Sequence, residues 1–144
     1  MKSKCEIRWL LFIASVISIF LVSGCNTLKS NGKDDKPYII ELGYETNDTN
    51  MRIANPKTKF DNSKDILVQA EYSIGSATDN VKSRIEIINL NTGEIIQEME
   101  WTETKHITGY SLTLKNKDWS LGTYSAIWKR NEMEVARTKF ELTK

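Results

Sequence analysis

The chain has 144 residues, of which 40% are hydrophobic and 27% are charged, with a formal net charge of +1. A length close to one domain of about 150 residues excludes multidomain architecture, and this average composition excludes wholesale disorder, collagen-like repeats and a polytopic membrane protein. The charge balance provides no basic excess for binding nucleic acid. The sequence therefore predicts a single folded domain.

The first 24 residues have the pattern of an export signal. Lys2, Lys4 and Arg8 precede an apolar run without charge from Trp9 to Gly24. This run is shorter than the about 20 residues of a membrane-spanning helix, and it is close to the about 7–15 apolar residues of a signal-peptide core. We therefore expect residues 1–24 to be a helical signal peptide; the alternative is an uncleaved signal anchor.

The end of this run, Leu21-Val22-Ser23-Gly24-Cys25, resembles the lipobox of bacterial lipoproteins, although Val22 stands where that family most often has leucine. The resemblance implies acylation of the Cys25 thiol, as in palmitate-carrying lipoproteins, and cleavage between Gly24 and Cys25. It also implies anchorage on the extracytoplasmic face of the cell membrane, since two acyl chains hold a protein there stably.

Residues 25–36 are expected to be the lipidated cysteine and a flexible linker, because Leu28 is the one large apolar residue among them. Cys5, the other cysteine, would leave with the signal peptide. The processed chain would then have no disulfide, no thiolate metal site and no cysteine nucleophile.

Residues 37–144 alternate apolar and polar side chains with period two, which predicts strands with one buried face. The alternating sets, in chain order, are Tyr38–Tyr44, Ile66–Tyr72, Val81–Ile87, Ile95–Trp101, Tyr110–Leu114, Tyr124–Trp128 and Val135–Leu142. A turn is expected at Asn89–Gly93, and a bulge near Arg137–Lys139, because Val135 and Phe140 are out of phase. About seven short strands favour an all-β, antiparallel β-sandwich.

Three segments, Phe60–Val68, Trp119–Tyr124 and Val135–Leu142, resemble the strand markers of bacterial immunoglobulin-like surface domains. The resemblance implies an immunoglobulin-like sandwich in which Tyr124 forms a tyrosine corner, with its ring packed inward and its hydroxyl bonded to nearby backbone. The Trp119–Tyr124 segment also resembles a bacterial proteinase inhibitor family, which leaves a protease-inhibitor module as an alternative function.

The sequence contains few residues arranged for catalysis or metal binding. His106 is the only histidine, which excludes a histidine pair for zinc, and Asp61, Ser63 and Asp65 begin a calcium-loop pattern that Ile66 and Tyr72 then break. Glu98, Glu100 and Glu103 could suggest paired catalytic carboxylates, but Glu98 and Glu100 share one strand face, which predicts a solvated sheet surface for these two. We therefore expect no enzyme activity, no cofactor and no metal.

The aromatic residues Trp101, Tyr110 and Trp119 are the expected binding surface, because such side chains dominate many recognition surfaces. Trp128 and Tyr124 are expected in the core. The function predicted from the sequence is a membrane-anchored, extracytoplasmic binding module whose partner is a protein or a wall polymer. Carbohydrate binding through the exposed aromatic residues is a further alternative.

Overall fold

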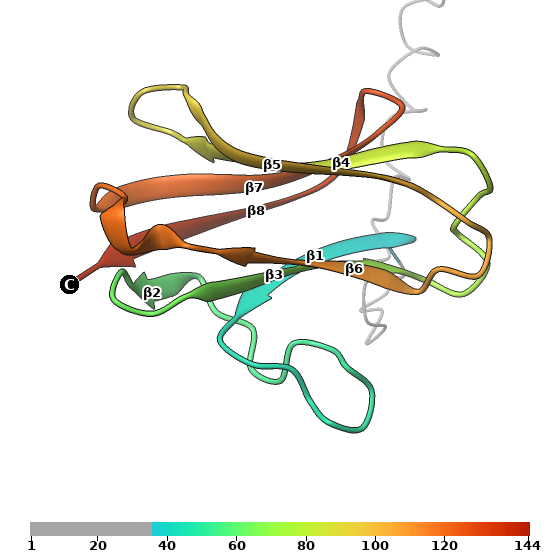
Figure 1. Ribbon diagram of the computed structural model, residues 1–144, viewed down its shortest axis with the longest axis horizontal. Helices are drawn as coiled ribbons and strands as arrows, with labels where there is room; N and C mark the ends of the chain where they lie inside the picture. Colours follow the sequence, from blue (N-terminus) through green and yellow to red (C-terminus); the bar gives the residue numbers. More distant parts are fainter. Residues whose placement is uncertain (1–35) are drawn as a thin grey trace, which may run out of the picture. The chain divides into compact units, whose positions relative to one another are not determined.

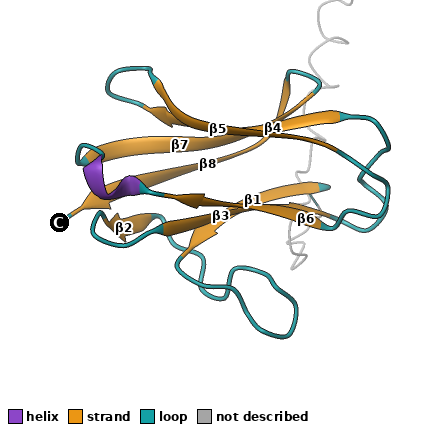
Figure 2. Ribbon diagram, viewed as in Figure 1, coloured by secondary structure: helices purple, strands orange, loops and turns teal. Residues whose placement is uncertain are grey.

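The computed structural model describes residues 36–144, which form a β-sandwich (Figures 1 and 2). The expected signal peptide, the Gly24–Cys25 cleavage site and nearly all of the linker lie outside these residues. The strands are β1 (Tyr38–Gly43), β2 (Lys59–Asp61), β3 (Ile66–Tyr72), β4 (Lys82–Asn89), β5 (Ile95–Thr102), β6 (Gly109–Leu114), β7 (Gly122–Arg130) and β8 (Met133–Thr143), with a 3-10 turn at Asn116–Asp118.

One sheet has the strand order β1-β3-β6 and the other has the order β2-β8-β7-β4-β5. The two sheets lie face to face, and the chain crosses between them several times (Figure 1). When β1, β3 and β6 are taken as strands A, B and E, and β8, β7, β4 and β5 as G, F, C and C′, this is the immunoglobulin arrangement. The expected immunoglobulin-like sandwich is confirmed.

The alternation of apolar and polar residues along each strand explains which side chains form the core. In β3, Ile66, Val68 and Ala70 are completely buried and point between the sheets. Trp128 and Tyr124 of β7 are also buried there, as the sequence predicts. Burial of such large apolar side chains is the dominant favourable contribution to folding.

Two details differ from the sequence-based expectation. The segment β2 forms an eighth strand and pairs in parallel with the end of β8, so the sandwich is not purely antiparallel. The bulge in β8 lies at Val135 rather than near Arg137–Lys139, because Trp128 pairs with Ala136 whereas Lys129 pairs with Glu134. The extra residue at 135 changes the phase before the second half of the strand begins.

The connections have the expected turn chemistry. At the predicted Asn89–Gly93 turn, the Asn89 side chain accepts a hydrogen bond of 2.9 Å from the Asn91 backbone N–H, and Gly93 has a φ of +75°. Between β7 and β8, Asn131 and Glu132 have φ values of +46° and +67°. Positive φ at both central residues is the requirement of a type I′ hairpin turn.

A buried ion pair closes one end of the sandwich. The Glu103 carboxylate is fully buried and receives hydrogen bonds of 2.6 and 2.7 Å from the Arg130 guanidinium. It also accepts from the Ser83 hydroxyl at 2.5 Å and from the Thr78 backbone N–H at 3.2 Å, and Arg130 donates further to the Tyr38 hydroxyl. Burial alone would raise the pKa of Glu103, but these donors outweigh it and hold the pKa below its usual value.

The part of the chain that the structure describes contains no helix with the length and hydrophobicity of a transmembrane span.

Candidate functional site

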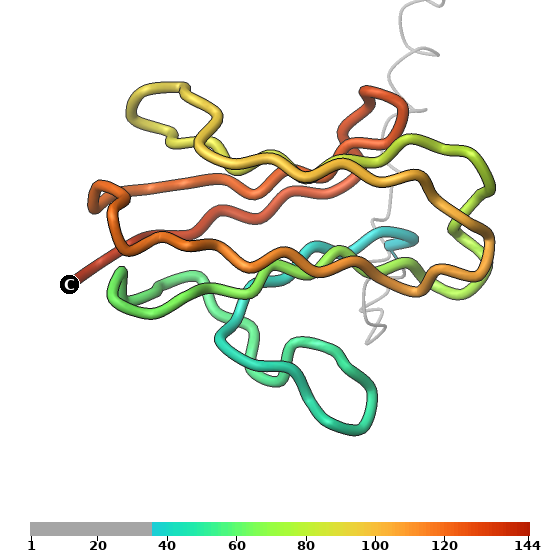
Figure 3. Tube along the Cα trace, in the orientation of Figure 1, coloured from blue at the N-terminus to red at the C-terminus, as the bar shows by residue number. Residues whose placement is uncertain are grey.

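A hairpin between β1 and β2 lies on the outer side of the three-stranded sheet, away from the five-stranded sheet (Figure 3). Thr46 and Ile53 form its bridge. Gln69 of β3 holds it in place, because its side-chain oxygen accepts from the Ile53 N–H at 2.9 Å and its nitrogen donates to the Met51 carbonyl at 2.8 Å. Gln69 faces away from the core and is nevertheless buried, since the hairpin covers it.

Beside this hairpin lies an open groove of about 640 Å³. Its walls come from the hairpin, from β3, from the start of β6 and from the loops that adjoin these two strands. Its lining residues include Met51, Arg52, Glu71, Ile74, Lys105, His106, Gly109 and Ser111. The groove therefore combines apolar residues with charges of both signs, as small-molecule and peptide sites do.

Glu71 is the most unusual residue of the groove. Its side chain is only 6% exposed, and its Oε2 lies 3.0 Å from Nε of Arg52. Within the described residues, its Oε1 has no hydrogen-bond partner. Burial raises the pKa of Glu71, and the neighbouring charge of Glu41 adds to this, while Arg52 opposes it. A buried carboxylate oxygen without a donor is costly in a fold and is often a functional feature.

Gly109 of β6 stands directly opposite Glu71 of β3. A Cβ atom at this position would lie 3.0 Å from the Ala70 carbonyl oxygen and 4.0 Å from the Cα of Glu71. Any larger side chain at 109 would therefore extend over the sheet beside Glu71. Glycine keeps the approach from the open edge of β6 to this carboxylate free.

Two apolar side chains on the groove are exposed to solvent. Ile74 is fully exposed and Met51 is 65% exposed. Single exposed apolar residues are common on protein surfaces. Here, however, two of them line one groove beside a buried carboxylate, and such a combination can contact the aliphatic part and the charged end of one ligand.

Replacing Glu71 with glutamine is expected to raise the free energy of unfolding by about 1 kcal/mol at pH 7. The reason is that the raised pKa means the folded state disfavours the charged form of Glu71. The folded state thus binds the proton more tightly than the unfolded chain, and lowering the pH stabilises the wild type relative to the variant. Urea unfolding of both proteins at pH 7 and at pH 4 measures the difference in their free energies of unfolding. A difference that is larger at pH 4 than at pH 7 would contradict this account.

The structure does not bring the three predicted binding aromatics together into one platform. Trp101 is 8% exposed, because it points between the sheets, and its ring stacks on that of Tyr110 with 4.7 Å between centroids. Trp119 is half-buried and packs against Tyr124 instead. The two groups lie at opposite ends of the sandwich, since Trp101 pairs with Ser83 and Tyr124 pairs with Asn89 of the same strand, β4.

Tyr124 has the contacts that a tyrosine corner requires. Its hydroxyl donates to the Ser120 carbonyl oxygen at 2.7 Å and lies 3.1 Å from the Ser120 hydroxyl. Its ring stacks on Phe140 with 5.5 Å between centroids. These contacts join the start of β7 to the turn that precedes it.

Substitution of Tyr124 by phenylalanine removes the hydroxyl and keeps the ring packed. The Ser120 carbonyl then loses its donor, so we expect the free energy of unfolding to fall by about 1 kcal/mol. Denaturant unfolding measures this change. An unchanged midpoint would show that the hydroxyl does not contribute to the corner.

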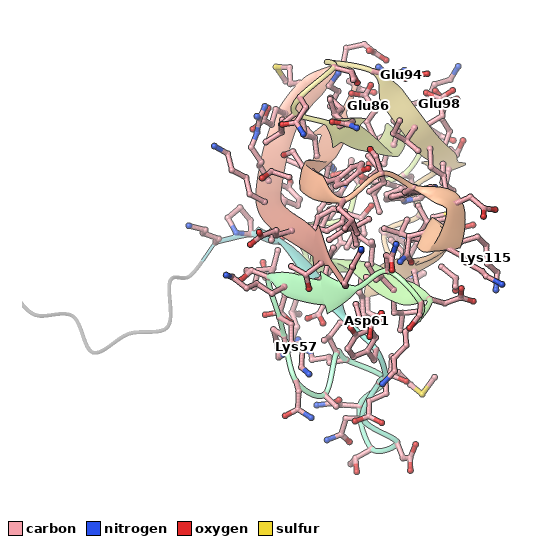
Figure 4. All side chains as sticks on the ribbon, turned by 90° about the vertical axis from the view of Figure 1, so that its left-hand side faces the viewer. Lys57, Asp61, Glu86, Glu94, Glu98 and Lys115 are labelled. Atoms are coloured by element: carbon pink, nitrogen blue, oxygen red, sulfur yellow. The ribbon has the colours of Figure 1, made fainter. Side chains whose placement is uncertain are left out.

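The acidic residues singled out from the sequence have separate environments. Glu98 is exposed on the outer surface of β5 (Figure 4), and Glu100 is exposed as well. Glu103 lies apart from that surface, because its side chain is turned inward onto Arg130. Asp61 accepts from the Ser63 N–H at 2.8 Å. Asp65 pairs with Lys115, so the two carboxylates of the partial calcium loop have different partners.

His106 is exposed and lies on the groove described above. The sequence could not indicate this position, since residues 50–52 and 105–109, which both line the groove, are far apart along the chain. Within residues 36–144, no cluster of three or more histidine, cysteine, aspartate or glutamate side chains is arranged to hold a metal ion.

No family model matches the sequence. No curated protein matches it either. Among solved structures, an immunoglobulin-like protein from Pseudomonas aeruginosa is similar to this chain at 10% sequence identity, with a TM-score of 0.49, over 73% of this chain and 92% of that one. The fold assignment itself rests on the strand order and register of this chain.

Proposed function

We propose that this protein is a lipid-anchored binding module of the bacterial cell envelope. In this proposal Cys25 carries the acyl chains on the extracytoplasmic face of the membrane, residues 25–36 form a tether, and the β-sandwich binds its partner. The support for the anchor is the lipobox resemblance at Leu21–Cys25. The support for binding comes from the folded domain.

The observation that carries the binding role is the groove next to Glu71. A carboxylate that is only 6% exposed, with one oxygen lacking a donor, lies beside exposed apolar side chains on a surface. This arrangement does not stabilise the fold, because a buried oxygen without a donor costs free energy. It favours binding, since a partner that supplies a donor to this oxygen removes that cost.

This groove replaces the aromatic platform as the proposed contact surface. Trp101 is stacked under Tyr110, and Trp119 lies at the other end of the domain. The carbohydrate alternative depended on those rings being exposed together. The groove instead offers a charge, hydrogen-bonding groups and apolar contacts within about 640 Å³.

The Cys25→Ala substitution tests the anchor. Because the acyl chains attach to the thiol, the variant should lose the lipid and the cleavage, and its N-terminal peptide should keep the export signal. Mass spectrometry of the membrane fraction should find acyl chains on Cys25 of the wild type and none on the Cys25→Ala variant. Cys5→Ala is the matched control, because it changes the other cysteine and should leave lipidation intact.

An unmodified N-terminus on the wild-type chain would contradict the anchor. A wild-type chain that retains residues 1–24 would instead support the uncleaved signal anchor. Neither result bears on the groove, which is tested separately below.

A further inference from the structure

Among residues 36–144, the β6 edge of the three-stranded sheet has backbone groups without a partner. In an antiparallel pair, alternate residues direct both backbone groups toward the partner strand, and those between them point away. The Tyr72 N–H donates to the Thr108 carbonyl at 3.0 Å, so Thr108 and Tyr110 bond toward β3. Gly109 and Ser111 therefore point their N–H and C=O groups toward the open edge of β6.

The hydrogen bonds of β6 agree with this alternation. Thr113 is the next outward-pointing residue of β6, and its carbonyl accepts a hydrogen bond of 3.4 Å from the side chain of Gln97 in β5. Within residues 36–144, no backbone group pairs with the outward groups of Gly109 and Ser111. An edge strand in this state can accept an added strand.

The geometry next to this edge determines which side chain of an added strand can reach Glu71. Strands in a sheet lie about 4.8 Å apart, so Glu71 of β3 is two strand spacings from a strand added to β6. Between them stands Gly109, which has no side chain, and a long side chain can therefore cross over it to Glu71. Lysine and arginine have this length and carry a donor at their end.

The charges around the groove favour a basic residue at this point. Glu71 has an oxygen without a donor, and Glu41 adds a second negative charge near it. Arg52 occupies the position beside Glu71, with its Nε 3.0 Å from the carboxylate and its side chain 57% exposed. Because the Arg52 side chain is largely in solvent, it returns to water when a second cation takes its place beside Glu71. Lys105 and His106 lie further along the groove. They are placed to contact an acidic residue that neighbours the basic residue in the bound peptide.

We propose that the groove binds an extended peptide segment of a partner protein, which adds as a strand to the free edge of β6 and places a lysine or arginine side chain on Glu71 in exchange for Arg52. This inference rests on the proposed binding function and identifies the class of partner. The aliphatic stem of the basic side chain passes over Gly109. Ile74 and Met51 contact the neighbouring apolar side chains of the peptide.

Two acetylated, amidated peptides of alternating threonine and valine, one with a central lysine and one with a central glutamine, provide the test. They are titrated at millimolar concentrations into the full chain in detergent micelles. The lysine peptide should bind at least tenfold more tightly than the glutamine peptide. Glu71→Gln should abolish this preference, whereas the matched control Glu98→Gln, a charge change on exposed β5, should preserve it. Arg52→Gln should strengthen binding of the lysine peptide severalfold.

Ser111→Pro tests the strand addition separately. It removes an outward-pointing N–H, and proline is tolerated on an edge strand. Binding of both peptides should fall at least tenfold while the β3–β6 pairing remains. Equal binding of the two peptides, or a lysine preference that survives Glu71→Gln, would overturn the inference. Binding of neither peptide would also overturn it, and crosslinks from the groove to another type of ligand in cells would then still support the proposed function.

Discussion

Replacing Glu103 with alanine is expected to lower the free energy of unfolding by about 3–5 kcal/mol. The substitution leaves the Arg130 guanidinium, which is 14% exposed, without its carboxylate, and it removes the acceptor of the Ser83 hydroxyl. Removing one partner of a buried pair is costly because the remaining charge cannot recover its hydration. Urea unfolding of the two proteins at pH 7 measures the difference.

The loss should depend on pH in a defined direction. The pKa of Glu103 is lower in the folded protein than its usual value of 4.5, so its stabilisation is fully present above that pH. The difference between wild type and Glu103→Ala should shrink as the pH falls through the folded-state pKa. Glu98→Ala, on the exposed face of β5, is the control and should change the free energy by less than about 0.5 kcal/mol. A loss for Glu103→Ala no larger than this control would contradict the network.

The second large effect is expected for Trp128→Ala, which should lower the free energy of unfolding by about 3–5 kcal/mol. The Trp128 ring is completely buried and lies 4.7 Å from that of Tyr72 and 5.3 Å from that of Tyr38, between centroids. Its indole N–H donates to the Ser83 hydroxyl at 3.1 Å. Alanine would therefore leave a cavity and remove a donor from the network around Glu103.

Trp119→Ala is the matched control for this prediction, because Trp119 is half-buried near the surface. Its loss should be clearly smaller than that of Trp128→Ala in the same unfolding measurement. Trp128 and Glu103 both contact Ser83. Their double variant should thus deviate from additivity, as expected for residues in one network. Equal losses for the two tryptophan variants would contradict the central position of Trp128.

Period-two alternation was sufficient to predict seven of the strands and most of their buried faces. It works here because each of these strands buries one face on a common core, as Ile66, Val68 and Ala70 do. The exception is the start of β5, where Ile95 is 48% exposed and Ile96 packs against the core, because the register of β4 and β5 shifts there. β2 was not predicted, because it has three residues and a single buried apolar side chain, Phe60. Its existence depends on a parallel partner at the far end of the chain.

The groove could not be predicted for a related reason. Alternation assigns Gln69 and Glu71 to the outer face of the sheet, and polar residues there are normally solvated. They are buried because a hairpin some distance away in sequence folds over that face. A sequence pattern predicts on which face of a strand a residue lies, but it does not predict which distant segment packs over that face. The same limit applies to Glu103, whose buried arginine partner comes from β7.

A photoreactive amino acid at position 74 of the full chain, in bacterial cells, tests the binding surface most directly. Ile74 is fully exposed on the groove, and Met133, 70% exposed at the start of β8, is the control position. A specific crosslinked product should form from position 74 and not from position 133, and Glu71→Gln should weaken it. Absence of a product at position 74, or the same products from both positions, would contradict the groove as the binding surface.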